Sequence, residues 1–144
     1  MTKPEMPLKF YEDFDAFKLF MLDIGLMGAM VEASAKAILV GNDIFKEYKG
    51  AFTELYVHNE LKQQGKTLYY HSVANSTIEI DFILQADDRI WPIEVKAEEN
   101  VKSKSLRTFI QNNPGLTGVR ISMKGRMPQD WLLCLPLYDF KYDL

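Results

Sequence analysis

Residues 78–96 have the sequence IEIDFILQADDRIWPIEVK, and this stretch decides the fold. Polar and apolar residues alternate over residues 78–85 with the period of two that is typical of a β-strand. Residues 89–96 alternate in the same way, and the acidic pair Asp87-Asp88 between the two runs has the chemistry of a tight turn. The stretch therefore predicts a β-hairpin.

The two faces of this hairpin differ in character. Asp81 shares one face with Glu79, and Glu94 shares one with Lys96, because side chains two apart on a strand point the same way, roughly 6–7 Å apart. We expect Asp81, Glu94 and Lys96 to lie in one region if these faces coincide. Pro92 predicts a bulge or break just before Glu94. The apolar side chains should fill the remaining face, namely Ile78, Ile80, Phe82 and Leu84, then Trp91, Ile93 and Val95.

Composition limits the classes of protein to consider. The 144 residues are 47% hydrophobic and 26% charged, which predicts one compact domain with a real core. The net charge of −3 means that nucleic-acid binding would need a local basic patch. The single cysteine, Cys134, excludes an internal disulfide and lies in an apolar run that predicts a buried thiol. No transmembrane segment or secretory signal is visible, so we expect a cytoplasmic location.

The order of predicted elements indicates an α/β fold with a mixed sheet flanked by helices. Residues 1–43 form a lead-in that we expect to pack on a core of residues 44–144. A helix at 103–111 between strands indicates a crossover connection, and residues 124–129 are expected to form a basic loop. The other helices are predicted at 24–32, continuing to 40, and at 44–64, and the strands at 18–22, 67–72, 116–123 and 131–135.

Asp81 and Glu94 have two interpretations. Their strand face can be polar simply because it is half exposed. Alternatively, the two carboxylates hold Mg²⁺, which prefers one or two carboxylates completed by water and substrate phosphates, and Lys96 orients the attacking water. Glu54, close to the apolar stripe of the predicted long helix, either completes this site or holds a boundary position, where it reaches solvent or pairs with His58 one turn further on.

A cluster of basic residues follows the hairpin. Lys102, Lys104 and Arg107 surround the start of a predicted helix, whose amide end favours anions. This is either an ordinary solvated helix start or a set of contacts for nucleic-acid phosphates. No glycine-rich loop followed by Lys-Ser/Thr is present, so this chain is not itself a P-loop ATPase.

Three motifs together resemble the PD-(D/E)XK nuclease superfamily: Glu54 on a helix, Asp81 within IEIDF, and Glu94-Val95-Lys96 after WPI. The resemblance implies a restriction-endonuclease-like αβββαβ core. It also implies that Asp81, Glu94 and Glu54 hold Mg²⁺ or Mn²⁺, that Lys96 is the catalytic lysine, and that DNA is the substrate.

A closer resemblance covers nearly the whole chain. The segments LFMLDIGL at 19–26, YKGAFTE at 48–54, the hairpin, and VKSKSLR at 101–107 resemble a C-terminal domain of unknown function that follows an AAA-type ATPase module in bacterial and archaeal proteins. An ATPase module is therefore an expected partner, and no membrane is expected. Fold does not fix function.

Two alternatives to cleavage remain open. One is a non-catalytic regulatory or interaction module, which the acidic balance and the aromatic residues near the C-terminus favour, namely Trp131, Tyr138, Phe140 and Tyr142. The other is nucleic-acid binding without cleavage through Lys102, Lys104 and Arg107.

Overall fold

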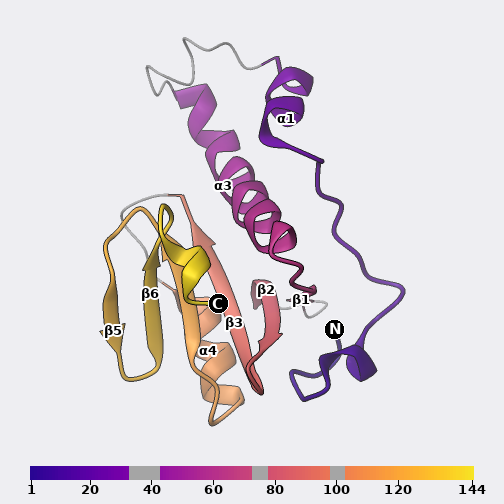
Figure 1. The fold of residues 1–144 in the computed structure, drawn as a ribbon, viewed down its shortest axis with the longest axis vertical. Helices are drawn as coiled ribbons and strands as arrows, with labels where there is room; N and C mark the ends of the chain where they lie inside the picture. The colour runs from indigo at the N-terminus through magenta and orange to yellow at the C-terminus, as the bar shows by residue number, and fades with distance from the viewer. Residues whose placement is uncertain (33–42, 73–77, 98–102) are drawn as a thin grey trace.

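A mixed β-sheet with a helix on each face organises the protein (Figure 1). The computed structural model describes residues 1–32, 43–72, 78–97 and 103–144. Within these residues the sheet has six strands in the order β1-β2-β3-β4-β6-β5. The predicted α/β class, with an αβββαβ core, a mixed sheet and a short N-terminal helical region, is confirmed.

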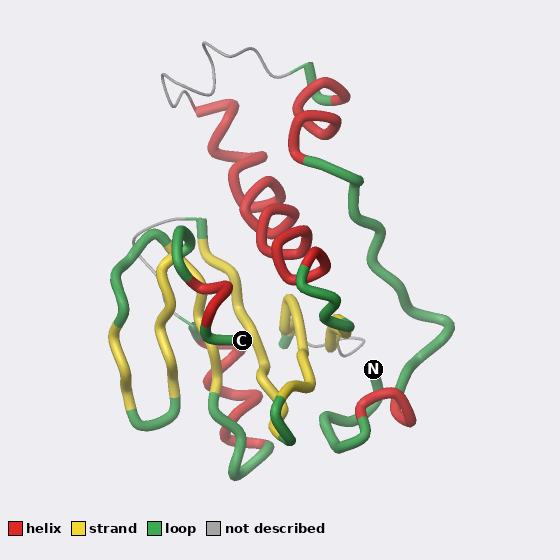
Figure 2. Tube along the Cα trace, in the orientation of Figure 1, coloured by secondary structure: helices red, strands yellow, loops and turns green. Residues whose placement is uncertain are grey.

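The N-terminal part contains a 3-10 helix, Leu8–Tyr11, and the short helix α1, Ile24–Met30. The side chain of Asp23 caps α1 by accepting a hydrogen bond from the main-chain N of Leu26 at 2.7 Å, as its position before the helix predicts. The strand predicted at 18–22 is wrong, because this segment is a loop that pairs with no strand of the sheet (Figure 2). The helix predicted for residues 33–40 lies outside the described residues.

The long helix α3 spans Asp43–Gln63, within one residue of the prediction. Gly65, at φ +76°, takes the left-handed conformation that ends many helices, and Lys66 N donates to the carbonyl of Leu61. Val57 and Leu61 are fully buried against the sheet. Glu54, one turn before Val57, therefore lies at the margin of the buried face.

Three consecutive antiparallel strands form one half of the sheet: β1 (Leu68–Ser72), β2 (Glu79–Ala86) and β3 (Arg89–Lys96). The predicted hairpin is confirmed. Asp87 and Asp88 connect β2 to β3 with φ of +50° and +56°, the left-handed pair that a two-residue type I′ turn requires.

A β-bulge interrupts β2 at Asp81 and Phe82. Tyr69 pairs with Ile83, but His71 pairs with Ile80, so Asp81 and Phe82 together lie opposite Tyr70. The extra residue changes which face the strand presents on either side of the bulge. The prediction that Ile80 shares a face with Phe82 and Leu84 is therefore wrong: Ile80 packs with α4, whereas Phe82 and Leu84 pack with α3.

Pro92 causes no bulge in β3. It pairs with Ile83 in an unbroken register from Phe82–Ile93 to Ala86–Arg89. The ladder with β4 begins one residue later, at Ile93, so the missing N–H of Pro92 falls before that ladder. The predicted bulge before Glu94 is thus wrong, and the bulge lies on the neighbouring strand; the alternative, a break just before Glu94, is seen on the β2 side, where the pairing of β3 with β2 ends at Ile93.

The other half of the sheet is parallel to β3. Helix α4 (Lys104–Asn112) connects β3 to β4 (Gly118–Ser122), and β4 pairs in parallel with β3 and with β6 (Leu132–Pro136). The predicted crossover is confirmed. The basic loop predicted at 124–129 is wrong in part, because Met127–Gln129 forms the edge strand β5, where Pro128 is tolerated.

The core has two layers, one on each face of the sheet. The α3 face includes Val57, Leu61, Phe82, Ile93 and Val95, and the α4 face includes Ile80, Ile83, Leu106, Phe109 and Cys134. Phe140 of the C-terminal 3-10 helix, Phe140–Tyr142, packs into the α3 face at 1% exposure. In the described parts of the chain, no helix combines the length and apolarity needed to cross a membrane.

Candidate functional site

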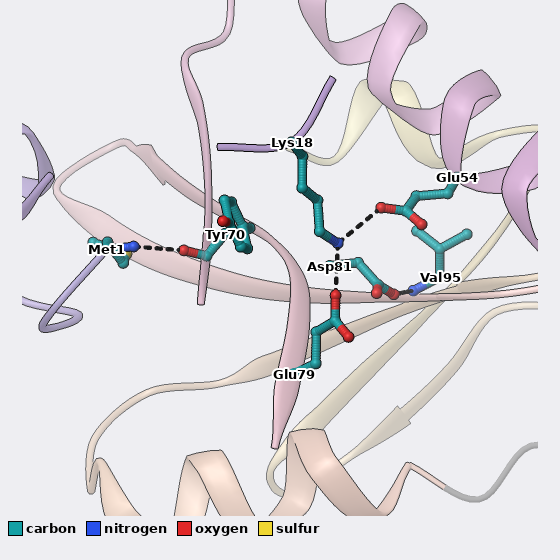
Figure 3. Close-up of polar contacts among 7 residues, drawn as sticks. All are labelled: Met1, Lys18, Glu54, Tyr70, Glu79, Asp81 and Val95. Atoms are coloured by element: carbon teal, nitrogen blue, oxygen red, sulfur yellow. Dashed lines mark hydrogen bonds and ion pairs between the residues drawn. The ribbon is translucent and has the colours of Figure 1, made fainter. Parts of the chain in front are cut away.

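Asp81 belongs to β2, at the bulge opposite β1 and one residue beyond the last pair of the β2–β3 ladder, Phe82–Ile93. One of its oxygens, Oδ2, accepts a hydrogen bond from the main-chain N of Val95 at 2.8 Å (Figure 3). This contact places the carboxylate beside the middle residue of the Glu94-Val95-Lys96 motif. Burial raises the pKa of Asp81 to about 6; the hydrogen bond from Val95 opposes this rise, and the nearby charge of Glu54 adds to it.

Lys18 brings two further carboxylates to the same place. Its Nζ lies 3.1 Å from Oε1 of Glu54 on α3 and 2.9 Å from Oε1 of Glu79 on β2 (Figure 3). Burial lowers the pKa of Lys18, but the hydrogen bonds and charges of Glu79 and Glu54 outweigh this and leave it raised. The lysine comes from the N-terminal loop, so this cluster joins three segments far apart in the sequence.

Glu54 therefore has a partner that sequence alone did not suggest. The predicted alternatives were a metal ligand, a side chain that reaches solvent, or a pair with His58. His58 instead stacks on Phe20 at 4.0 Å between ring centroids, and its Nδ1 lies 3.0 Å from Oδ1 of Asn59. The sequence held one sign that Lys18 has a partner: it is the single charged residue within the apolar run 17–22.

Glu94 and Lys96 form an ion pair at the end of β3. Lys96 Nζ lies 3.1 Å from Oε1 of Glu94, whose side chain is only 6% exposed. Within the described residues, the second oxygen of Glu94, Oε2, is buried without a hydrogen-bond partner. A buried carboxylate oxygen without a partner is costly, so this position needs an explanation beyond packing.

The two carboxylates of the motif approach from different sides. Ile93 and Val95 pack on the α3 face, so alternation directs Glu94 and Lys96 toward the α4 face. Asp81 lines the cavity on the α3 side, the opposite side of the sheet from Glu94, yet Lys96 is close enough for its charge to lower the pKa of Asp81. Among the described residues, no group of three or more His, Cys, Asp or Glu is arranged to hold a metal ion.

Arg120 is a residue that the sequence analysis missed. Its Cα pairs with that of Glu94 in the parallel register, and the residue is 8% exposed. Its guanidinium donates to Sγ of Cys134 at 3.0 Å and to Oγ of Ser103 at 3.5 Å. The buried thiol predicted for Cys134 is confirmed. An arginine inside the short strand GVRIS was the available signal, because buried arginines need partners.

The basic cluster is partly described. Lys104 and Arg107 are exposed on the first turns of α4, and the guanidinium of Arg107 lies 5.9 Å from the ring centroid of Trp131. Lys102 lies outside the described residues. Arg126 forms ion pairs with Asp139 and Asp143, so its charge already has partners in the C-terminal segment.

Residues 60–62 of α3 also have the pattern Glu-x-Lys, and there Glu60 has a structural role, because it pairs with Lys141 at 3.3 Å.

Comparison with known proteins gives one match. No curated protein and no solved structure matches the chain. The model of one protein family, described as a domain of unknown function (DUF4143), matches residues 49–137. This match contains α3 from Lys49 onward and all six strands, together with Glu54, Asp81, Glu94 and Lys96. The chain belongs to the DUF4143 family.

Proposed function

We propose that this domain is the C-terminal nuclease-fold module of an AAA-type ATPase and that it hydrolyses phosphodiester bonds of DNA with Mg²⁺ or Mn²⁺. One observation carries the proposal: the partly buried carboxylate of Asp81 contacts the main chain of Val95, between Glu94 and Lys96. Strongly perturbed carboxyl groups of this kind gather at functional sites more often than elsewhere.

Two features suit a divalent cation. Glu94 has a buried oxygen without a hydrogen-bond partner among the described residues, and burial holds the pKa of Asp81 well above its ordinary value. The two side chains approach from opposite faces of the sheet, so one cation would relieve both costs only by binding between β2 and β3, within reach of each; Mg²⁺ commonly takes only one or two carboxylates, with water and phosphate oxygens as its other ligands. Asp81 and Glu94 are therefore the proposed ligands. Glu54 would join them only after it separates from Lys18.

The remaining groups have defined tasks in this proposal. When bound, the cation would polarise the phosphate and lower the pKa of a water molecule. Lys96, whose side chain is 36% exposed, would donate hydrogen bonds to the attacking water and offset the charge that develops on the phosphate. Lys104 and Arg107, together with Lys102, would contact the phosphates of the bound strand.

A plasmid-nicking assay tests this proposal. We expect supercoiled DNA to be nicked with Mg²⁺, and Glu94→Gln and Lys96→Met to reduce the rate at least about a hundredfold. The control is Glu60→Gln, which changes a Glu-x-Lys motif on the surface of α3 and should leave the rate unchanged. Equal nicking by Glu94→Gln and the wild type would show that another protein or site is responsible.

The structure also favours a second candidate, a non-catalytic interaction module. Many large apolar residues of the N-terminal segment are exposed; Phe14, Phe17, Leu19 and Leu22 are each at least 72% exposed. Exposed apolar residues gathered in one segment are typical of interaction surfaces. Phe140 does not belong to such a surface, because it is buried, whereas Tyr138 is 70% exposed. The absence of nicking by a folded wild type, together with salt-insensitive binding to an ATPase module, would favour this candidate.

A further inference from the structure

The N-terminal loop crosses the α3 face of the candidate site. Residues 12–22 of this loop, here called the strap, run from the 3-10 helix toward α1 (Figure 1). Phe17 and Leu19 point outward, at 72% and 88% exposure, whereas the side chain of Lys18 between them is only 23% exposed. Lys18 is therefore the part of the strap that enters the site.

The strap covers a cavity of about 220 Å³ that contains Asp81. Strap residues form one wall of the cavity, and Asp81, Phe82 and His58 form part of the other. Phe20 closes over this wall, stacked on His58 and 5.8 Å from the ring centroid of Phe82. The strap therefore borders the opening beside Asp81 on the α3 side.

Few described contacts hold the strap in place. Besides Lys18 and Phe20, the amide of Asn59 donates to the carbonyl of Leu22 at 3.2 Å. The exposed apolar side chains contribute little burial to its attachment. A segment held by few contacts, here the polar ones of Lys18 and Asn59 and the packing of Phe20, opens at low cost in free energy.

We propose that the strap is an autoinhibitory device: Lys18 holds Glu54 and Glu79 beside Asp81, and its ammonium competes with a divalent cation for these carboxylates. When the strap lifts, the cavity opens and Glu54 becomes free to serve as a third carboxylate of the site. This inference rests on the proposed function, because it concerns the regulation of the same site.

Lys18→Met tests the device, because methionine keeps an unbranched apolar stem but lacks the charge. Mn²⁺ binding is measured by calorimetry, and hydrogen exchange of residues 12–22 is measured in the same samples without metal. We expect Lys18→Met to bind Mn²⁺ at least about tenfold more tightly, since one cationic charge near the ion is removed. We also expect faster exchange in the strap. The control is Lys9→Met, an exposed lysine of the same N-terminal region, which should change neither quantity.

The possible outcomes separate this inference from the proposed function. If Lys18→Met loosens the strap while the affinity for Mn²⁺ stays the same or falls, the inference is wrong and the proposed function stands. Unchanged exchange in the strap would also overturn it, because Lys18 would then not fasten the segment. If no variant binds Mn²⁺ at millimolar concentration, the proposed function fails and this inference fails with it.

Discussion

Replacing Asp81 by asparagine should stabilise the protein at neutral pH. The side chain keeps its size, and its amide oxygen can still accept the hydrogen bond from Val95 N. What changes is the charge, which is partly buried in a site that opposes ionisation. Residues retained for function often cost stability in this way, so a gain on substitution is the expected sign of a functional carboxylate.

The magnitude follows from the pKa of Asp81, which burial raises from 3.8 to about 6 in the folded protein. Because the folded state binds the proton more tightly than the unfolded state, the contribution of Asp81 to stability is present below pH 3.8 and is lost as the pH rises through about 6. Relative to a side chain that stays neutral, Asp81 lowers the free energy of unfolding by about 3 kcal/mol at pH 7.5 and by less than about 1 kcal/mol at pH 4. Asp81→Asn should recover about that much free energy of unfolding at each pH.

Urea denaturation in the presence of a metal chelator, at pH 4 and pH 7.5, provides the measurement. The control is Asp130→Asn at an exposed turn, which should differ little from the wild type at either pH. The reasoning is refuted if Asp81→Asn is no more stable than the wild type at pH 7.5, or if its advantage does not shrink toward pH 4.

Two further predictions concern packing and the turn. Gly118→Ala should destabilise the fold by about 1–3 kcal/mol, because a Cβ there would lie 3.0 Å from the buried side chain of Leu106; Gly50→Ala, where a Cβ meets nothing within 4 Å, should instead stabilise α3 by up to about 1 kcal/mol. Thermal unfolding of both variants checks the opposite signs, and equal shifts would contradict them. Asp88→Gly should raise the free energy of unfolding by up to about 1 kcal/mol, because glycine adopts φ near +56° without strain; a loss measured by urea denaturation would show that the aspartate side chain itself stabilises the turn.

The parts of the fold that depend on local sequence were predicted well. The hairpin of β2 and β3 follows from alternation and from the turn at Asp87 and Asp88, and α3 follows from its apolar spacing and the glycine that ends it. Strand β5 was missed because its three residues are all exposed and carry no apolar alternation. An edge strand of this kind is specified by its partner rather than by its own sequence.

The parts that depend on pairing between distant segments could not be predicted. The bulge at Asp81 arises from the register of β2 with β1, which no local pattern of β2 reveals. The ion pairs of Lys18 with Glu54 and Glu79 join residues far apart in the chain. The strand predicted at 18–22 has the right apolar composition, but its loop position leaves Leu19 and Leu22 exposed. The sequence thus predicts which strand carries Asp81 and which carries Glu94, but not the contacts that define their chemistry.

The claim that Asp81 and Glu94 hold a divalent cation is tested most directly by calorimetric titration of the protein with Mn²⁺. The account predicts one binding site per chain in the wild type and in Glu60→Gln, and loss of binding in Glu94→Gln, with circular dichroism showing that all three are folded. A folded wild type that releases no binding heat at millimolar Mn²⁺, or a Glu94→Gln variant that binds as the wild type does, would contradict it.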